Sequence, residues 1–357
     1  MEGSLFVSSG CKCFSFAKEL EFVMSKFSIR SAASQGAFRW AIARYGKVAV
    51  AHTEAIITNR MDLVGFSSSH RQVREGNATG ITFNIGPTPG RLLDVTGMVV
   101  KKDPYNLIRE VQNTADGIII AALTDEHLRL AKAAAAADMH CFVEKPIAGS
   151  VAEGQEMIDD FGKSKGKLVV GQVLPSFPEF ELLRATILSQ GIDQVESLKM
   201  KRFVPWNETD DEATNRVKGG AAPDLLVHDL HLIASVGKYL AVELLGIDLR
   251  YGLPQGLKLK VSLDGAAGKF EVEGGASRAY SGFHHSYDVR FRDGTFLAFD
   301  GEKVTGCEHE IAPRTVGEIF GNELQIAAEY FRGQRAHPSF LCPTMALTAL
   351  QILSDVA

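Results

Sequence analysis

The sequence of 357 residues lacks the features that mark several protein classes. It has no basic run, and 38 Lys and Arg residues against 43 Asp and Glu residues give a formal net charge of -5. Proteins that bind nucleic acids depend on clustered positive charge, so this chain has no electrostatic basis for such a partner. Long apolar runs are also missing. A membrane-spanning helix needs roughly 18 to 20 consecutive apolar residues, and no stretch of this sequence reaches that length. We therefore expect no nucleic acid and no membrane as partners.

Cysteine is scarce as well. The sequence contains five cysteines, an odd number at scattered positions, which argues against a disulfide framework and indicates a reducing compartment such as the cytoplasm. Cys11 and Cys13 have no second pair nearby, so we expect no metal site there. What remains is an ordinary globular composition, 45% hydrophobic and 23% charged, in a chain long enough for two domains.

The first 36 residues differ from the rest. They are rich in serine and carry four basic residues, as organellar targeting segments do, but Glu19 and Glu21 are unusual in such segments. We expect residues 1–36 to form a poorly ordered N-terminal extension, with organellar targeting as the alternative.

Strands and helices are predicted to alternate from Phe38 to Val143. The run Gly117–Ala122 is continuously apolar, which is typical of a parallel strand that helices cover on both faces. Such alternation predicts an α/β fold with a doubly wound parallel sheet, and we assign residues 37–147 to this first domain. Its predicted strands are 38–43, 62–66, 117–122 and 140–143, and its predicted helices are 48–58, 104–113 and 125–139.

The second half of the chain has a different pattern. From Val242 to Gly306 it is mostly strand-like, and Arg292-Asp-Gly294 indicates a hairpin turn. We expect residues 148–357 to form an α+β domain with a largely antiparallel sheet and helices on one face. Further strands are predicted at 168–173 and 194–203, and helices at 151–164, 178–190, 318–332 and 343–356.

Glu144, Lys145 and Pro146 directly follow a predicted strand of the parallel sheet. In open parallel sheets, ligands bind beyond the carboxyl ends of the strands, so Lys145 is predicted to point at a bound ligand. The alternative is a surface turn with a solvated lysine, as most lysines are.

The first strand-to-helix turn is the second place where such sheets bind ligands, because glycines there let the backbone approach a pyrophosphate. The turn here, from Arg44 to Ala49, keeps only the middle glycine of G-x-G-x-x-G. Arg44 at the first glycine either crowds the turn or brings a guanidinium near phosphate. We expect the turn residues to bind a dinucleotide, against the alternative of a sheet that no longer does; they are Tyr45, Gly46, Lys47 and Val48.

After the second predicted strand, NAD-selective domains usually carry an acidic residue that binds the ribose 2′-hydroxyl. This chain instead has Ser67, Ser68, Ser69, His70 and Arg71. Hydroxyls and a guanidinium can donate hydrogen bonds to a 2′-phosphate, whereas a carboxylate would repel it. We therefore favour NADP over NAD, with Ser68, Ser69 and Arg71 as its ligands, unless this is only a polar loop.

Asp224 and His228 are spaced i, i+4 on a predicted helix, which places their Cβ atoms about 5–6 Å apart. Histidine has an unperturbed pKa near 6.5 and suits a general base at neutral pH, and a neighbouring carboxylate can orient its ring. The alternative is a first-turn Asp favoured by the helix dipole and a buried structural histidine. Adding His231 would complete a metal-binding face, but no further ligand cluster is evident and we expect no metal.

These motifs together resemble the glucose-fructose oxidoreductase and inositol dehydrogenase family (Gfo/Idh/MocA). The resemblance depends on Glu144-Lys145-Pro146 after a βαβ domain, and on the Gly219-Gly220 turn that leads into Asp224 and His228. It extends from about Phe38 to the C-terminus. Thr124 and His127 also match the turn that in this family lies beside the nicotinamide ribose.

The resemblance implies a Rossmann-like first domain, an open-faced sheet used for oligomerisation as a homodimer or homotetramer, and an NAD(P)-dependent oxidoreductase acting on a sugar, cyclic polyol or related carbonyl compound. By the same resemblance, Lys145 would hydrogen-bond the reacting hydroxyl, His228 would exchange its proton, and Asp224 would bind substrate and steady the histidine. Thr124, His127, Glu144 and Lys145 would also contact the cofactor. Expected pocket residues are Phe177, Lys201, Arg202, Trp206, Asn207 and His284.

Three departures from the family pattern are visible: Arg44 in place of a glycine, a long stretch from Gly76 to Gly97, and an early stop after the last helix. Two alternative functions therefore stay open. One is a glycoside hydrolase of the same fold that uses transient oxidation, which needs no pair of carboxylates at the glycosidic bond. The other is a cofactor-poor binding or regulatory relative, against which the presence of Lys145, Asp224 and His228 argues.

Overall fold

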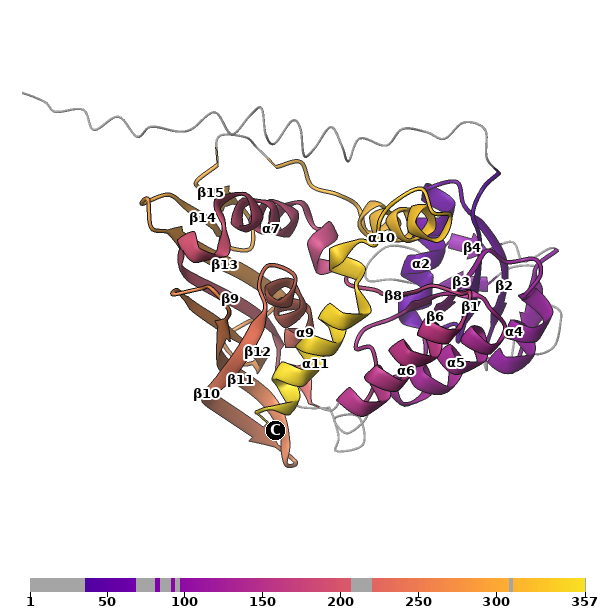
Figure 1. The fold of residues 1–357 in the computed structure, drawn as a ribbon, viewed down its shortest axis with the longest axis horizontal. Coiled ribbons are helices and arrows are strands. Elements are labelled where there is room, and N and C mark those ends of the chain that lie inside the picture. Colours follow the sequence, from indigo (N-terminus) through magenta and orange to yellow (C-terminus); the bar gives the residue numbers. More distant parts are fainter. Residues whose placement is uncertain are drawn as a thin grey trace, which may run out of the picture. The chain divides into compact units, whose positions relative to one another are not determined.

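The computed structural model describes residues 36–68, 81–83, 91–93, 97–206, 220–307 and 311–356 (Figure 1). Only the backbone is described for residues 81–83 and 91–93. The expected N-terminal extension therefore lies outside these ranges except for Gly36. From Phe38 onward the chain forms one compact unit.

A six-stranded parallel sheet forms the first half of this unit (Figure 1). The strand order is β5-β2-β1-β6-β7-β8, so the first strand lies in the middle and the order reverses between β1 and β6. This reversal is the topological switch point. The connections that follow β1 and β6 run in opposite directions there, which leaves a crevice at the carboxyl ends of these two strands. The strands are β1 Arg39–Ala43, β2 Asp62–Ser67, β5 Val99–Lys101, β6 Gly117–Ile120, β7 His140–Val143 and β8 Leu168–Val170.

Helices cover both faces of this sheet, which confirms the predicted doubly wound fold. Alternate residues of β1 point to opposite sides, so that Trp40 joins one core and Ala41 the other. The Trp40 side is covered by α2 (Lys47–Thr58) and, from the far end of the sequence, by α10 (Val316–Phe331). The Ala41 side is covered by α4 (Pro104–Val111), α5 (Thr124–Ala136) and α6 (Val151–Lys163).

The stretch Gly76–Gly97, for which the sequence predicts no clear element, contains two short strands. β3 (Ile81–Phe83) and β4 (Arg91–Leu93) pair in antiparallel fashion as a separate two-stranded sheet.

A seven-stranded sheet forms the second half, in the order β10-β11-β12-β9-β13-β14-β15. Its pairs are antiparallel except for β12 with β9, so the prediction of a largely antiparallel sheet is confirmed. The helices α7 (Pro178–Gln190), α9 (Ala221–Ala234) and α11 (Pro343–Ser354) share a core with one face of it. The strands are β9 Val195–Pro205, β10 Tyr239–Arg250, β11 Leu253–Leu263, β12 Lys269–Ser277, β13 His284–Phe291, β14 Phe296–Phe299 and β15 Val304–Thr305, and the short 3-10 helices are η1 Leu174–Ser176, η2 Ile192–Gln194 and η3 Ser339–Leu341.

The predicted hairpin is present between β13 and β14, which pair in antiparallel fashion. Gly294 takes a φ of 85° in its turn, a left-handed conformation that favours glycine.

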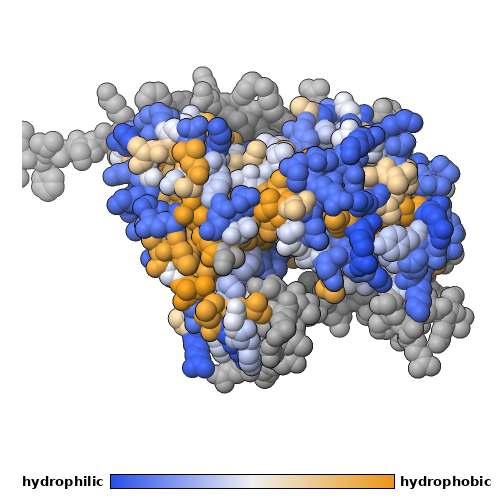
Figure 2. Space-filling view, turned by 60° about the horizontal axis from the view of Figure 1, so that its bottom comes forward, coloured by the Kyte–Doolittle hydropathy of each residue, from blue (hydrophilic) through white to orange (hydrophobic). Residues whose placement is uncertain are grey.

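Strand β10 is the edge of the second sheet and is unusually apolar for an exposed strand. Several of its large hydrophobic side chains are exposed, and Figure 2 shows hydrophobic surface gathered on this side of the molecule. Exposed apolar patches of this kind often mark interaction surfaces. The exposed side chains on this strand are Leu240, Leu244, Leu245, Ile247 and Leu249. Among the helices that the structure describes, none is long and apolar enough to cross a membrane.

Candidate active site

Lys145 and Asp224, which are 79 residues apart in the sequence, form an ion pair. The Lys145 Nζ atom lies 2.7 Å from Asp224 Oδ1 and 3.0 Å from the Asp224 carbonyl oxygen. Lys145 follows the carboxyl end of β7, and Asp224 lies in the first turn of α9. Gly220, just before α9, has a φ of 95°, and a Cβ there would lie 2.2 Å from the Pro254 carbonyl oxygen, so only glycine allows this close approach of the helix start. The two motifs on which the resemblance depends are therefore in contact.

His228 lies one helical turn beyond Asp224, and its described hydrogen bond is with a different residue. The His228 Nδ1 atom lies 3.0 Å from Oε1 of Gln172, which follows β8. Because an amide oxygen only accepts, Nδ1 carries the proton in this arrangement and Nε2 keeps the lone pair. Asp224 instead pairs with Lys145. The ring is thus oriented by Gln172, and the carboxylate on the same helix holds the lysine.

The environment of His228 favours the neutral imidazole. Burial lowers the pKa of His228 well below its ordinary value of 6.5, and the positive charges of Lys145 and Arg202 lower it further. A neutral ring at pH 7 can accept a proton, which a general base requires.

A second group of buried polar side chains lies behind these residues. His52 Nε2, on α2, lies 2.6 Å from Oε1 of Glu144, and Glu323, on α10, accepts a hydrogen bond of 2.6 Å from the Gln172 backbone N–H. Burial of Glu144 opposes its ionisation, but the hydrogen bond and charge of His52 and the charge of Lys145 hold its pKa below the ordinary value. Burial, reinforced by the charge of Glu144, raises the pKa of Glu323 well above 4.5. Glu144 and Glu323 thus brace the segments that carry Lys145 and Gln172.

His127 connects the turn after β6 to the Lys145 turn. Its Nδ1 and Nε2 atoms lie 2.9 Å from the Pro146 carbonyl oxygen and 3.2 Å from the Ala122 carbonyl oxygen, and its side chain is buried. Burial lowers the pKa of His127, so the neutral ring has one N–H to donate to these two carbonyls. Thr124 is the first residue of α5 at the same edge of the sheet.

The turn after β1 has features of a nucleotide-binding turn although Arg44 stands at its first glycine and Ala49 at its third. Arg44 adopts a φ of 66°, the left-handed conformation that a glycine would take. Gly46 is the exposed N-cap of α2, which has no side-chain cap and no acidic residue in its first turn. Ala49 is fully buried, as close packing of helix on strand requires. An exposed helix start without a Cβ at Gly46 and without negative charge fits the phosphates of a dinucleotide.

The other residues predicted around the cofactor have mixed positions. The Tyr45 hydroxyl lies 2.6 Å from Thr53 Oγ1, so this side chain points into the fold, and the Tyr45 backbone N–H donates to the Ser67 carbonyl oxygen. Val48 is half-buried on α2, and of Lys47 only the backbone is described. Ser68 is buried after β2. Ser69 and Arg71 lie outside the described residues.

The expected pocket residues differ in how far their side chains are exposed. Arg202 is buried, and its Nε atom lies 2.6 Å from Oδ2 of Asp229 on α9. Lys201, its neighbour on β9, is exposed and points to the opposite face of the sheet, because successive side chains alternate. Asn207 lies outside the described residues.

His231 does not complete a metal face with Asp224 and His228. Its Nε2 atom lies 2.8 Å from the carbonyl oxygen of Phe340, inside the fold. In the part of the chain that the structure describes, no group of three or more His, Cys, Asp or Glu side chains is arranged to hold a metal ion.

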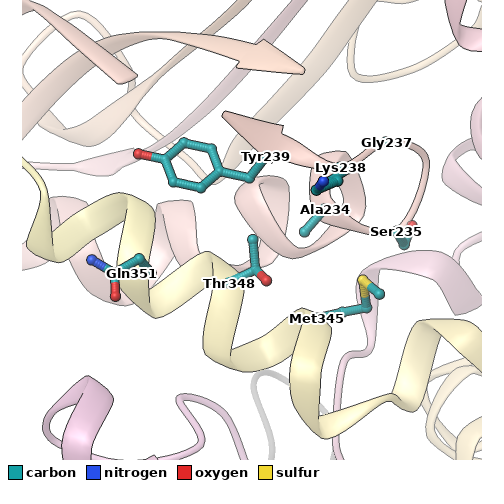
Figure 3. Close-up of a pocket in the computed structure, with 8 residues that line it drawn as sticks. All are labelled: Ala234, Ser235, Gly237, Lys238, Tyr239, Met345, Thr348 and Gln351. Atoms are coloured by element: carbon teal, nitrogen blue, oxygen red, sulfur yellow. The ribbon is translucent and has the colours of Figure 1, made fainter. Parts of the chain in front are cut away.

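A pocket of about 410 Å³ lies between the C-terminal end of α9 and α11 (Figure 3). It is lined by Ala234 and Ser235 on one side and by Met345, Thr348 and Gln351 on the other. Ten residues of helix separate Ala234 from Asp224, which corresponds to about 15 Å. This pocket is therefore distinct from the Lys145–Asp224 contact.

The sequence did not predict three residues that contact the candidate site: Gln172, His52 and Glu323. For Gln172 a signal existed, since it follows the carboxyl end of a strand in a parallel sheet, where ligand-facing residues are expected. His52 and Glu323 lie within amphipathic helices, where no local pattern separates them from ordinary helix residues.

Dinucleotide-dependent oxidoreductases use an architecture of this kind, a doubly wound parallel sheet followed by a second sheet domain, and here helix α9 of the second domain carries Asp224 and His228. Comparison with known proteins agrees with this architecture. Residues 38–172 match the family described as an oxidoreductase family with an NAD-binding Rossmann fold, Gfo/Idh/MocA. The predicted resemblance is thereby confirmed, and the matched residues belong to this family.

One curated relative is the myo-inositol 2-dehydrogenase of Thermotoga maritima, which is 28% identical over 233 residues. The match covers 65% of this chain and 61% of the relative, so the chain spans less than two thirds of that protein's length.

Solved structures of the same fold include GenD2 from gentamicin A biosynthesis, in complex with NAD, with a TM-score of 0.70 at 15% identity over 92% of this chain and 95% of that one. Another is the biliverdin reductase of Synechocystis sp. PCC 6803, in complex with biliverdin and NADP+, with a TM-score of 0.65 at 16% identity over 89% and 97%. At such low identity these likenesses establish the fold alone. The different ligands of the two proteins show that this fold decides neither substrate nor cofactor.

Proposed function

We propose that this protein is an NAD(P)-dependent dehydrogenase or reductase that acts on a CH–OH group of a sugar, a cyclic polyol or a related carbonyl compound. The observation that carries the proposal is the 2.7 Å contact between Lys145 Nζ and Asp224 Oδ1, which brings the Glu-Lys-Pro turn and the start of α9 together. The oxidoreductase family of residues 38–172 and the inositol dehydrogenase relative support the same activity.

The roles of the side chains follow from their chemistry. Lys145 carries three N–H donors, two of which contact Asp224, so the remaining donor is available to the reacting oxygen. His228 accepts the hydroxyl proton at Nε2 during oxidation and returns it during reduction, while Gln172 fixes the ring through Nδ1. Asp224 stabilises the charge of Lys145 and presents its second carboxylate oxygen, Oδ2, to a substrate hydroxyl. When bound, the nicotinamide supplies the acceptor or donor of the hydride.

The cofactor is proposed to lie along the strand ends from β2 to β7. In this proposal the turn of Tyr45, Gly46, Lys47 and Val48 approaches the phosphates with the backbone of its last three residues, because the Tyr45 N–H is bonded to Ser67, and Thr124, His127, Glu144 and Lys145 line the nicotinamide side. The side chains of Glu144 and His127 bond to His52 and to the Pro146 carbonyl oxygen, so in this proposal they position the turn that carries Lys145. No acidic residue follows β2, which favours NADP through Ser68, Ser69 and Arg71.

Nucleotide titration tests this proposal. NADPH is expected to raise the melting temperature more than NADH at equal concentration. A ligand that binds only the folded state stabilises it more strongly the lower its Kd is. A larger effect of NADH would reverse the cofactor preference and leave the dehydrogenase function in place. No shift with either nucleotide would contradict the function itself and favour a cofactor-poor binding protein.

A substrate panel forms the second stage. Sugars and inositols are incubated with the preferred oxidised nucleotide, and reduced nicotinamide is followed by its absorbance at 340 nm, the standard assay wavelength. Net reduction supports a dehydrogenase. Cleavage of a glycoside without net reduction of the nucleotide would instead favour the glycoside hydrolase alternative.

The exposed side chains of β10 are proposed to contact a second copy of the chain in a homodimer or homotetramer. An edge strand with several exposed large hydrophobic residues would otherwise be prone to aggregation. Light scattering of the purified protein is expected to show an oligomer. Ile247→Lys, at an exposed position, is expected to shift the distribution toward monomer, and a native chain that is monomeric at micromolar concentration would contradict this proposal.

A further inference from the structure

Arg44 and Glu126 form an ion pair at the switch point of the parallel sheet. The Arg44 Nε atom lies 3.0 Å from Glu126 Oε2, and its terminal nitrogen lies 2.6 Å from Glu126 Oε1. Two parallel N–H···O bonds of this kind are the geometry in which a guanidinium binds a carboxylate most strongly. Both side chains keep some exposure, 33% for Arg44 and 22% for Glu126, so the pair remains accessible to solvent.

The pair connects two turns that belong to different strands. Arg44 follows the carboxyl end of β1, and Glu126 lies in the first turn of α5, after β6. β1 and β6 are the neighbours between which the strand order reverses. A dinucleotide bound to this sheet crosses the crevice at this reversal, with its pyrophosphate beside the turn after the first strand. The Arg44–Glu126 pair therefore spans the opening that the ligand must enter.

The backbone around Arg44 is fixed independently of this pair. The Arg44 backbone N–H donates to Ser67 Oγ at 2.9 Å, and the Tyr45 backbone N–H donates to the Ser67 carbonyl oxygen at 2.7 Å. These bonds hold the turn against the end of β2, while the long Arg44 side chain can rotate. Loss of Glu126 as a partner therefore leaves the turn in place and frees only the guanidinium.

We infer that Arg44 is a diphosphate-binding residue, and that Glu126 occupies its guanidinium when no nucleotide is bound. Phosphate and carboxylate oxygens match the same planar fork of N–H donors, so one can replace the other. In place of the missing glycine, the turn thus supplies a positive charge. This inference rests on the proposed nucleotide-dependent function and specifies how the substituted turn binds its ligand.

Glu126 acts as an internal competitor in this arrangement. The ligand must displace a carboxylate that is part of the chain, and the displaced carboxylate then remains near the diphosphate as a like charge. Both effects lower the apparent affinity for the nucleotide. The first does so because only molecules with a free guanidinium bind directly, and the second because two negative charges repel each other. Removal of the Glu126 charge should therefore strengthen binding, which is the opposite of the usual effect of changing a residue at a binding site.

Isothermal titration calorimetry of the full chain tests the inference without turnover. Glu126→Gln is expected to lower the Kd for NADPH and NADH by about twofold to fivefold, the range expected for removal of one partly exposed charge pair. Arg44→Gly is expected to raise both Kd values by a similar factor or more. In the Arg44→Gly background, Glu126→Gln is expected to have little further effect, since the two residues act through one contact.

Ligand fragments locate the contact. ADP-ribose, which contains the diphosphate, is expected to show the same ratios of Kd as the full nucleotides, whereas AMP is expected to show none. Glu156→Gln is the matched control, because Glu156, like Glu126, pairs with a basic side chain. Its partner is Lys132 of α5, at an exposed position. That variant should bind nucleotide like the native chain.

The outcomes separate this inference from the proposed function. Nucleotide binding that is unchanged in Glu126→Gln and in Arg44→Gly, or weakened in Glu126→Gln, would overturn the diphosphate role of Arg44 and leave the oxidoreductase proposal intact. An equal response of AMP would overturn it too, because the contact would then lie on the adenosine side. Absence of binding to the native chain and to every variant would overturn both.

Discussion

The two ends of the candidate site are built in different ways. At the proton-transfer end, the side chains predicted from the motifs are present, and Lys145 and His228 are each held by a hydrogen-bonding partner. At the nucleotide end, the turn after β1 has lost a glycine, and Arg44 takes the left-handed conformation in its place. The first end depends on side-chain chemistry, and the second depends on backbone shape.

This difference explains why a residue other than glycine can stand in the turn after β1. A turn needs only a particular φ and ψ, which a residue other than glycine can adopt at a cost of order 1 kcal/mol when its neighbours hold it. A proton-transfer group needs a given titratable atom at a given place, and no other residue supplies it. Substitutions at the two ends should therefore affect different quantities.

The largest effect is expected at the proton-transfer end. Lys145→Ala and His228→Ala should each lower kcat by about 10²- to 10⁴-fold, the usual contribution of a positioned acid or base. Nucleotide affinity should change little, because the described contacts of both side chains are to Asp224 and Gln172. Steady-state kinetics and calorimetry on the same preparations measure both quantities.

Full activity of either variant on a confirmed substrate would show that its residue has been given the wrong role. A parallel loss of nucleotide binding would remove the contrast between the two ends. His231→Asn is a control on the same helix, because the described hydrogen bond of His231 is with the Phe340 carbonyl oxygen and not with a residue of the candidate site.

A smaller effect is expected for Gln172, which orients His228. Gln172→Leu should lower kcat by roughly tenfold while KM changes less, since the ring loses its fixed orientation but keeps its titratable atom. Gln172→Glu keeps an acceptor for the Nδ1 proton, and its negative charge should raise the pKa of His228. The acid limb of the pH profile should then move to higher pH in the Glu variant.

A purely structural role for Gln172 would leave that limb where it is, and this outcome would contradict the orienting role. Gln325→Leu on α10 serves as a control for loss of a partly buried amide, because Gln325 bonds to Glu329.

The smallest effect concerns Glu323, beneath the Gln172 segment. Its pKa is raised in the folded protein, so ionisation of this carboxyl costs more in the folded state than in the unfolded chain. Stability from this residue is therefore lost as pH rises above about 4.5 toward the folded pKa. Glu323→Gln, which keeps the oxygen that accepts from Gln172, should melt a few degrees higher at pH 8, and the gain should vanish near pH 4.

Thermal unfolding of both proteins across this pH range measures the difference between them. A gain that is the same at pH 4 and pH 8 would show that the proton on Glu323 is not its cause. Glu318→Gln is unsuitable as a control, because the Glu318 side chain forms a capping box with Thr315.

Much of the fold was accessible from the sequence because its signals are local. The apolar run Gly117–Ala122 and the hairpin turn at Gly294 each specify an element without reference to distant residues. Lys145, Asp224 and His228 could be chosen because strand ends and helix faces place them without knowledge of the full packing. The resemblance implied that Lys145 and Asp224 belong to one site, whereas their direct ion pair became visible only in the structure.

The remainder required three-dimensional structure. No spacing in the sequence connects His228 with Gln172, 56 residues earlier, or Arg44 with Glu126, 82 residues later. The sequence assigned the orientation of His228 to Asp224, since i, i+4 neighbours are the only partners that a helix pattern can reveal. The coverage of Trp40 by α10 was equally invisible, because the two are joined only through the tertiary fold.

The return of α10 to the first sheet has a consequence for the synthesis of the chain. Trp40 and Phe331 share one core, yet about 290 residues separate them in the sequence. At ribosomal rates of about 5–20 residues per second, the part of the apolar face around Trp40 that α10 covers stays exposed for roughly 15 to 60 s after it leaves the ribosome. During that interval it is a surface for chaperones to bind, and a chain interrupted before residue 316 would never cover it. Efficient production of this protein therefore depends on the completion of residues 316–331.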